Sequence, residues 1–138
     1  MMFTLQQAAA WLEGATLKGE GATAITRVHT DTRSLQPGDL FVALRGERFD
    51  AHDFLTDVAA RGAAAVVAER VPDGFALPAL VVSDTRHALG QIAQQWRKHF
   101  AIPVIGVTGS NGKTTVKEMI ASILAAAYGD DEILATRG

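Results

Sequence analysis

Hydrophobic residues along the chain recur at two different spacings, which predict helices and strands in alternation. Near the start, Leu5, Ala8 and Leu12 fall on one face of a predicted helix. Thr4 and Gln7, at the start of this helix, have the Ser/Thr-x-x-Gln spacing of a capping box, in which each side chain bonds the other residue's backbone N–H. The first element is therefore expected to be a short capped helix.

Three later segments also have helical spacing. One begins after Asp50 and ends at Gly62, a second begins after Asp84 and reaches toward Phe100, and a third opens at Lys113. The two aspartates suit helix starts because a carboxylate accepts hydrogen bonds from the first unpaired backbone N–H groups. The apolar face expected on the last helix comprises Val116, Met119, Ile120, Ile123, Leu124 and Ala127.

Short apolar runs of strand length lie between the predicted helices. They are residues 40–44, 64–68, 79–82 and 104–108, with a final strand expected at 132–135 and short strands within 15–28. Runs that are apolar on both sides predict buried parallel strands. Strands that alternate with helices predict an α/β fold.

A division of the chain is expected around residues 83–103. Residues 1–83 are predicted to form a compact α/β unit, and residues 84–138 a linker helix and the opening of a second domain. A lone strand, loop and helix cannot cover its own apolar faces. The second region is therefore expected to be the truncated start of a larger domain.

Composition narrows the classes of function. The chain has 138 residues, 48% of them hydrophobic and 20% charged, which is ordinary for a globular protein. Thirteen Lys and Arg against fifteen Asp and Glu give a net charge of −2, which argues against a general nucleic-acid binder. The absence of cysteine excludes disulfides, thiol catalysis and Cys-ligated metals.

The distribution of apolar residues also bears on location. No uninterrupted apolar run approaches the ~20 residues that a membrane-spanning helix needs. The opening residues, 1–7, lack the basic and apolar regions of a secretory signal. We therefore expect a soluble, cytoplasmic protein.

The strongest chemical signal is the glycine-rich segment 106–115, which follows a predicted strand and opens a predicted helix. Its glycines would let backbone N–H groups turn toward phosphate oxygens, and the helix N-terminus adds unpaired donors. Lys113 would place a positive charge at the β- and γ-phosphates of ATP, and the Thr114 hydroxyl would bind Mg²⁺. A standard Walker A loop has glycine where this chain has Val107, so the loop is a variant.

The predicted ATP-binding residues are Thr108, Gly109, Ser110, Asn111, Gly112, Lys113, Thr114 and Thr115, with Lys113 as the catalytic residue and Thr114 as the metal ligand. The competing interpretation is a glycine-rich surface turn beside an exposed lysine. The preceding strand and the following amphipathic helix favour the phosphate loop.

Segment 108–114 resembles the ATP-binding motif of the Mur ligases, the amide-bond-forming enzymes of peptidoglycan precursor synthesis. Segment 31–54, with Asp31-Thr32-Arg33 near its start and Gly46-Glu47-Arg48-Phe49-Asp50-Ala51-His52 later, is similar to the N-terminal domain of certain members. Those members add D-alanyl-D-alanine to UDP-N-acetylmuramoyl-tripeptide. Members that add the third amino acid to UDP-N-acetylmuramoyl-dipeptide are the nearest alternative. The resemblance covers essentially the whole chain.

The resemblance implies a small UDP-sugar-binding α/β domain over residues 1–83, followed by the strand, phosphate loop and helix that begin a P-loop ATPase domain. The implied reaction uses ATP and Mg²⁺: the peptide carboxylate takes the γ-phosphoryl group, and the amine of the dipeptide attacks the resulting acyl phosphate. A chain of this extent is expected to be inactive alone and part of a ligase that is monomeric at full length.

The resemblance also implies a UDP-sugar site in the loops that follow the strands, made of Asp31, Thr32, Arg33, Arg45, Gly46, Arg48 and His52. Arg33 suits a diphosphate because a guanidinium offers a planar pair of donors. The alternative is an exposed arginine in a turn that Asp31 or Thr32 closes. His52 is expected to face either the solvent or the sugar nucleotide.

A function of a different kind remains an alternative to the ligase. If the 138 residues were the whole gene product, the chain would be a nucleotide-binding module without ligase activity.

Overall fold

A computed structural model describes residues 1–137 of the chain. The chain divides into two compact units, Met1–Phe100 and Ala101–Gly138. The first has an α/β fold, as the alternation of apolar runs predicts. None of the helices in the described part of the chain is long and apolar enough to cross a membrane.

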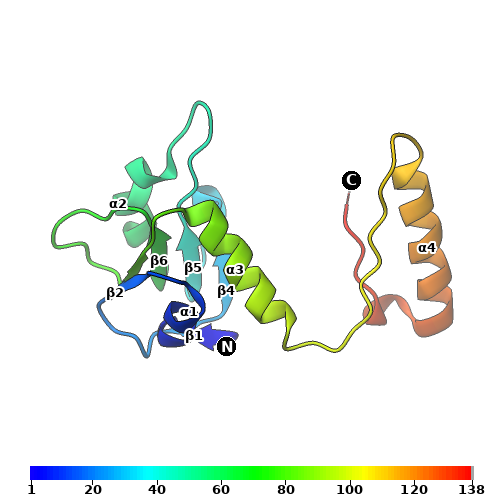
Figure 1. The fold of residues 1–138 in the computed structure, drawn as a ribbon, viewed down its shortest axis with the longest axis horizontal. Helices are drawn as coiled ribbons and strands as arrows, with labels where there is room; N and C mark the ends of the chain where they lie inside the picture. The colour runs from blue at the N-terminus through cyan, green and yellow to red at the C-terminus, as the bar shows by residue number, and fades with distance from the viewer. Residues whose placement is uncertain (138) are drawn as a thin grey trace. The chain divides into compact units, whose positions relative to one another are not determined.

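A five-stranded sheet forms the centre of the first unit, with the strand order β2-β7-β6-β5-β4 (Figure 1). The strands are β2 Thr16–Lys18, β4 Arg27–His29, β5 Asp39–Val42, β6 Ala65–Ala68 and β7 Ala79–Val81. The four strands from β4 to β7 are parallel, and β2 pairs antiparallel with β7 at one edge. The predicted buried parallel strands are therefore confirmed, and four strands end at one edge of the sheet.

A separate two-stranded ribbon joins the start of the chain to residues before β4. In it, β1 (Phe3–Thr4) pairs antiparallel with β3 (Ala24–Ile25), so that Phe3 lies opposite Ile25. Both of these side chains are buried. The ribbon thus fixes the start of the first helix against the main core.

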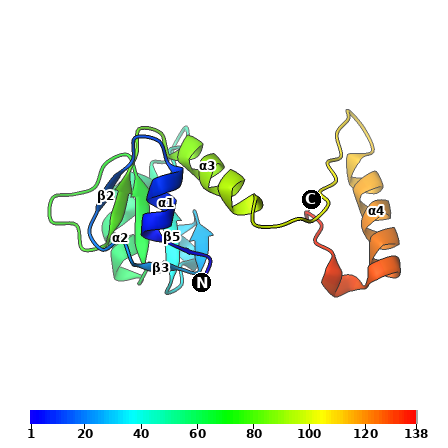
Figure 2. The same ribbon diagram turned by 60° about the horizontal axis from the view of Figure 1, so that its bottom comes forward.

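Helices cover both faces of the sheet (Figure 2). Helices α1 (Leu5–Trp11) and α3 (Thr85–Arg97) bury apolar side chains against one face, and α2 (Leu55–Ala60) buries its own against the other. Successive residues of a strand point to opposite faces, so Val66 belongs to the α2 side and Val67 to the α1 and α3 side. This double cover explains why β6 and β7 are apolar at every position.

The helix starts expected from the sequence are confirmed. The backbone N–H of Thr4 donates to Gln7 Oε1 at 2.8 Å, and the backbone N–H of Gln7 donates to Thr4 Oγ1 at 3.3 Å. Asp84 Oδ1 accepts from the His87 N–H at 3.1 Å and begins α3. Asp50 caps a short 3-10 helix, η2 (Ala51–Phe54), which leads into α2.

Helix α3, which was expected to link the two regions, packs within the first unit. Its Ala88 and Ile92 are buried in the same cluster as α1 and the sheet. Trp96, near its end, lies edge-on to Phe3 with the ring centroids 6.0 Å apart. The compact unit therefore extends to Phe100, because α3 and α1 together cover this face of the sheet.

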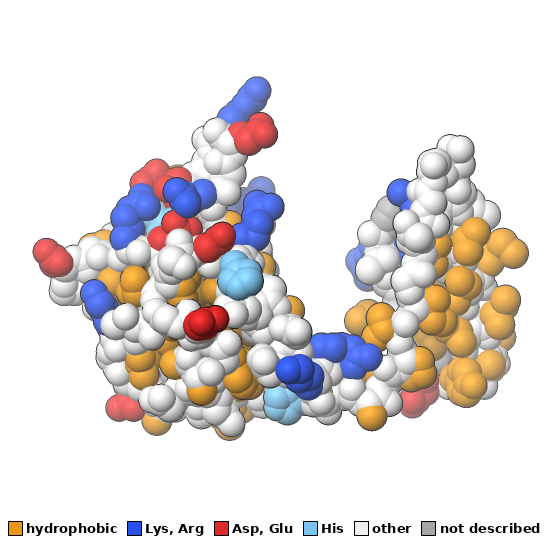
Figure 3. Space-filling view, in the orientation of Figure 1, with side chains coloured by type: hydrophobic (Ala, Val, Ile, Leu, Met, Phe, Trp, Pro, Cys, Tyr) orange, Lys and Arg blue, Asp and Glu red, His pale blue; other side chains and the backbone are white. Residues whose placement is uncertain are grey.

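The second unit contains helix α4 (Lys113–Tyr128) and the 3-10 helix η3 (Asp130–Glu132). The strands expected at 104–108 and 132–135 are not formed in the described residues, so these two predictions are wrong. A strand needs a hydrogen-bonded neighbour, and the described residues of this unit supply none. Helix α4 has no buried residue, and Figure 3 shows hydrophobic side chains along it.

Candidate functional site

The loops that follow the four parallel strands meet at one edge of the sheet. In open α/β sheets, ligands bind outside the carboxyl ends of the strands, where such loops converge. The loop after β4 carries Asp31 and Arg33, the loop after β5 carries Arg45, and Glu69 directly follows β6. Figure 3 shows acidic and basic side chains gathered together on the first unit. We take this carboxyl edge as the candidate site.

The loop after β4 is closed by its own aspartate. Asp31 Oδ1 accepts from the backbone N–H and the Nε–H of Arg33, both at 2.9 Å, and Asp31 Oδ2 accepts from Nη2 at 2.7 Å. These bonds from Arg33 hold the pKa of the Asp31 carboxyl well below its ordinary value. Thr32 lies between them in the 3-10 helix η1 (Thr32–Ser34). Asp31 thus forms the predicted turn and orients Arg33.

Arg33 remains accessible despite that pairing. Its side chain is 86% exposed. Two of its nitrogens bond Asp31, and the remaining guanidinium N–H groups are available to a ligand. The turn and the binding role, which the sequence posed as alternatives, are therefore compatible.

An ion pair at the base of this loop holds both of its ends. Arg27 Nε and Nη2 donate to the two carboxylate oxygens of Asp39 at 2.7 and 2.6 Å, and Nη2 also donates to the Ser34 carbonyl at 2.9 Å. Asp39 is 1% exposed, and its pKa is lowered chiefly by the hydrogen bonds from Arg27. Asp39 Oδ2 also accepts from the Gln36 N–H at 2.8 Å. The loop that carries Arg33 is therefore pinned to β4 and β5.

The loop after β5 projects from the sheet and carries three predicted site residues. Arg45 pairs with Glu69, with 2.9 Å between Nη2 and Oε1. The Gly46 N–H donates to the Phe49 carbonyl at 2.6 Å, and this bond closes the projecting turn. Arg48 lies in the turn and is exposed. Arg45 is thus held at the sheet edge by an ion pair, whereas Arg48 is exposed in the projecting turn.

His52 departs from expectation. Its side chain is fully buried, so it faces neither solvent nor an open site. Nδ1 lies 2.7 Å from Asp50 Oδ1, and Nε2 accepts a hydrogen bond from the backbone N–H of Glu69 at 2.8 Å. Both ring nitrogens are used inside the protein. The prediction that His52 contacts solvent or ligand is corrected: in this arrangement it connects two loops of the site.

The Asp50 carboxylate contacts three donor groups, two on His52 and one on Arg70. Its Oδ1 accepts from the backbone N–H and the ring of His52, and its Oδ2 lies 3.3 Å from Arg70 Nη2. The backbone bond from His52, followed by the side-chain bonds from His52 and Arg70, lowers the pKa of Asp50 to about 2. This carboxylate therefore caps η2 and also orients Arg70.

A cavity of about 420 Å³ lies at the ends of β5, β6 and β7. It is lined by Arg45, Gly46, Glu69, Asp84, Thr85 and Arg86. Thr85 is buried, and its hydroxyl donates to Glu69 Oε2 at 3.3 Å, so Glu69 holds Thr85 through one oxygen and Arg45 through the other. The cavity offers guanidinium and hydroxyl donors beside carboxylate acceptors, which suits a ligand with anionic and hydroxyl groups.

Sequence reasoning missed Glu69, Arg70, Thr85 and Arg86 as residues of this edge. The available signal was their position, since Glu69 and Arg70 directly follow one predicted strand and Thr85 and Arg86 lie soon after the next. Among residues 1–137, no group of three or more His, Cys, Asp or Glu side chains is placed to hold a metal ion.

The predicted phosphate loop lies in the second unit and leads into α4. Gly109 and Gly112 have φ values of 148° and 75°, in the region that side chains with a Cβ rarely adopt. Gly112 caps α4, and the first helical bond runs from the Val116 N–H to the Gly112 carbonyl at 3.0 Å. The backbone N–H groups of the first turn therefore have no partner within the helix, which fits phosphate binding.

The predicted catalytic and metal-binding side chains lie in this first turn. Lys113, Thr114 and Thr115 are all exposed. A Thr hydroxyl is a hard oxygen ligand of the kind that Mg²⁺ takes, and a lysine ammonium is a compact charge for phosphate oxygens. The local arrangement thus fits ATP and Mg²⁺.

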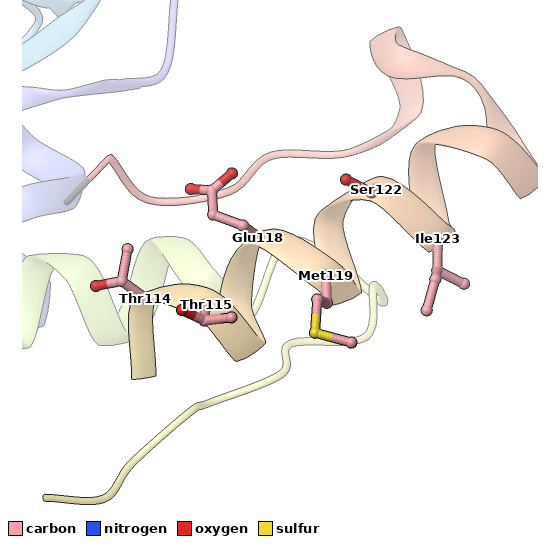
Figure 4. A pocket seen from close by; sticks show the side chains of 6 residues that line it. All are labelled: Thr114, Thr115, Glu118, Met119, Ser122 and Ile123. Atoms are coloured by element: carbon pink, nitrogen blue, oxygen red, sulfur yellow. The ribbon is translucent and has the colours of Figure 1, made fainter. Parts of the chain in front are cut away.

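A hollow of about 550 Å³ runs along α4 from its first turn (Figure 4). Its lining comes entirely from this helix: Thr114, Thr115, Glu118, Met119, Ser122 and Ile123. Met119 and Ile123 are 59% and 65% exposed. Because no second element contributes a side chain, this hollow is an uncovered helix side and does not bring catalytic groups together.

Two family descriptions match the chain. "Mur ligase family, catalytic domain" matches residues 24–97, more than half of the chain. "Mur ligase middle domain" matches residues 107–138, which include the phosphate loop and α4.

Individual relatives agree with these families. UDP-N-acetylmuramoyl-tripeptide–D-alanyl-D-alanine ligase from Escherichia coli K12 is 50% identical over 88% of this chain, which is 26% of that protein. UDP-N-acetylmuramoyl-L-alanyl-D-glutamate–2,6-diaminopimelate ligase from Aquifex aeolicus is 42% identical over 70% of this chain and 20% of its own length. The chain thus spans about a quarter or less of these relatives.

Solved structures give the same result for the fold. A crystal structure of MurF from Acinetobacter baumannii matches 90% of this chain and 28% of its own, with a TM-score of 0.81 and 44% identity. MurF ligase from Thermotoga maritima, solved in complex with ADP, matches 75% of this chain and 24% of its own, with a TM-score of 0.67 and 36% identity.

Proposed function

Because the chain belongs to the Mur ligase family, we propose that it supplies the UDP-sugar-binding domain and the start of the ATP-binding domain of a larger ligase. This ligase joins D-alanyl-D-alanine to UDP-N-acetylmuramoyl-tripeptide. The likeness to the A. baumannii enzyme carries the proposal, because it joins sequence identity and fold over nine-tenths of the chain. We expect the ligase to act in the cytoplasm as a monomer.

The UDP-sugar site of the proposal is the carboxyl edge of the first unit. Arg33 and Arg45 come from the loops after two adjacent strands, and a guanidinium binds phosphate oxygens through paired N–H groups. Asp31, Thr32 and Gly46 shape these loops, and Arg48 is exposed in the projecting turn. His52, the remaining predicted residue, is buried and bonds Asp50 and the backbone of Glu69.

The ATP site of the proposal is the phosphate loop, residues 108–115. Its backbone N–H groups and Lys113 hold the phosphates, and the Thr114 hydroxyl is a ligand for magnesium, which neutralises phosphate charge when bound. The positive φ angles of Gly109 and Gly112 and the open first turn of α4 support this assignment. The ADP complex of the T. maritima relative is consistent with it.

The proposed reaction has two steps. An oxygen of the tripeptide's terminal carboxylate attacks the γ-phosphorus, the bond to ADP breaks, and an acyl phosphate forms. The amine of D-alanyl-D-alanine then attacks the acyl carbon, phosphate leaves and the amine loses a proton. Lys113 and the loop N–H groups contribute by holding the transferring phosphoryl group and neutralising its charge.

Two other functions are tested against this one. The A. aeolicus relative supports a ligase that adds the third amino acid to UDP-N-acetylmuramoyl-dipeptide. A nucleotide-binding module without ligase activity is the candidate from another class, and a reading frame that continues past Gly138 into a ligase would reject it.

The experiment that tests the proposal is a calorimetric titration of the chain with UDP-N-acetylmuramoyl-tripeptide. The same sugar peptide without UDP is the control ligand, and circular dichroism checks that the chain is folded. We expect saturable binding that requires UDP. A folded chain that binds neither ligand would reject the proposed UDP-sugar site. The alternative ligase is distinguished in the full-length enzyme, by whether D-alanyl-D-alanine or a single amino acid is the substrate that it joins.

A further inference from the structure

His52 is the most deeply buried titratable side chain at the carboxyl edge, and the proposed chemistry does not use it. Its side chain is fully buried, although its partner Asp50 is partly exposed and Arg70, which pairs with Asp50, reaches the surface. A polar ring is costly to bury unless its nitrogens are hydrogen-bonded. Both nitrogens are bonded here, one to Asp50 and one to the Glu69 N–H.

The hydrogen bonds fix the protonation of this ring. A backbone N–H can only donate, so Nε2 of His52 must accept and carries no proton. The ring proton is therefore on Nδ1, 2.7 Å from Asp50 Oδ1, and the imidazole is neutral in this arrangement. A ring with both positions committed acts as a rigid connector and has no free nitrogen for proton transfer to a ligand.

Each of the two partners of His52 also contacts an arginine of the site. Asp50 uses one oxygen for His52 and the other for Arg70 Nη2, at 3.3 Å. At the other end, the backbone of Glu69 is held by His52, and its carboxylate pairs with Arg45 at 2.9 Å. Arg45 and Arg70 are 59% and 60% exposed, so both guanidinium groups reach the surface.

We propose that His52 is a positioning residue of the UDP-sugar site, which sets Arg45 through Glu69 and Arg70 through Asp50. This inference rests on the proposed function, because it takes the diphosphate as the anion that Arg45 binds. His52 joins the loops after β5 and β6, across 17 residues of sequence, and so holds two arginines from different strands in one geometry. Preorganised side chains bind more tightly because less conformational freedom is lost on binding.

The test is a double-mutant cycle between His52→Asn and Arg45→Ala, with the affinity for UDP-N-acetylmuramoyl-tripeptide measured by calorimetry on the chain. Asn at position 52 keeps a donor near Asp50 but is too short to accept from the Glu69 N–H. We expect H52N to weaken binding about tenfold, the size of one charged hydrogen bond. In the R45A background the same substitution should change affinity less than about twofold, because the arginine through which it acts is absent.

The matched control is His87→Asn, which makes the same chemical change at an exposed position on α3. H87N should bind like the unsubstituted chain. Thermal unfolding of each variant checks folding. If H52N does not fold, His52→Gln replaces it, because the longer amide reaches the Glu69 N–H but loses the Asp50 contact; its cycle is then made with Arg70→Ala.

The outcomes separate this inference from the proposed function. An unsubstituted chain that is folded but does not bind the ligand overturns the proposed function, and the inference with it. If that chain binds but H52N has no effect, or if H52N costs the same tenfold in the R45A background, His52 does not position Arg45 and only the inference fails. R45A binding with unchanged affinity would also overturn it.

Discussion

The two units of the chain use similar sequence patterns with opposite results. In the first, apolar strands and helix faces bury one another on both sides of a sheet, so residues such as Phe41 and Leu80 are fully enclosed. In the second, α4 has an apolar face of the same kind, but Val116 and Ile123 remain 46% and 65% exposed. An amphipathic pattern therefore specifies an element, and a core forms only where complementary elements are present.

The largest expected effect is that of a substitution in the phosphate loop, which should abolish the proposed function of the second unit and leave that of the first unchanged. In the proposed full-length ligase, Lys113→Ala should lower ATP-dependent ligation about a thousandfold or more, because the transferring phosphoryl group loses a neighbouring positive charge. Binding of the UDP-sugar, which we assign to the first unit, should not change. Phosphate release measures the first quantity and calorimetry the second. Retained ligation would reject the phosphate-loop assignment.

One substitution of an apolar residue in each unit compares the two units by their effect on the free energy of unfolding. Leu80→Ala, in the first unit, should lower the free energy of unfolding by about 2–5 kcal/mol, because it leaves a cavity among fully packed neighbours. Ile123→Ala, on the exposed side of α4, should change it by less than about 0.5 kcal/mol. Urea unfolding followed by circular dichroism measures both. A large effect at Ile123 would mean that α4 is covered in solution.

The sequence predicted the first unit better than the second, and the reason is physical. The capping box at Thr4, the cap at Asp84 and the buried parallel strands depend on local chemistry or on unbroken apolar runs, and all three are confirmed. The strands expected at 104–108 and 132–135 have the right composition but no partner in the described residues. Pairing is a long-range property, so composition alone could not decide it.

The candidate site shows the same limit. The placement of Arg33 and Arg45 in loops after strands was predictable, because parallel strands end at a common edge. The pairing of Arg45 with Glu69 was not, since the partners lie on loops of different strands. Burial of His52 was missed for the same reason: its acceptor role depends on a backbone N–H that the fold brings close.

A smaller effect is expected at the first loop of the site. Arg33→Ala should weaken binding of UDP-N-acetylmuramoyl-tripeptide by about 1.5–3 kcal/mol, the size of a charged hydrogen bond to a phosphate. The free energy of unfolding should change little, because the side chain is 86% exposed. Titration calorimetry and urea unfolding measure the two quantities. Unchanged affinity would leave Arg33 as a surface residue whose role is to close the turn with Asp31.

The smallest effect we expect concerns pH. The hydrogen-bonded carboxylates of the first unit should make its free energy of unfolding depend on pH. The pKa of Asp50 is lowered from 3.8 to about 2, so the folded state binds the proton more weakly than the unfolded state does. The stabilisation is therefore complete above the unfolded pKa and is lost as the pH falls from about 4 to about 2. Asp50→Asn should reduce the slope of unfolding free energy against pH in this window.

Asp31 and Asp39 also have lowered pKa values and add to the slope in the same direction. The contribution of Asp50 is therefore the difference between the unsubstituted chain and D50N. Asp73→Asn, in an exposed loop, is the control that removes a carboxylate without removing these contacts. If D50N and D73N flatten the curve equally, the lowered pKa does not come from the bonds of His52 and Arg70, and Asp50 does not stabilise the first unit through them.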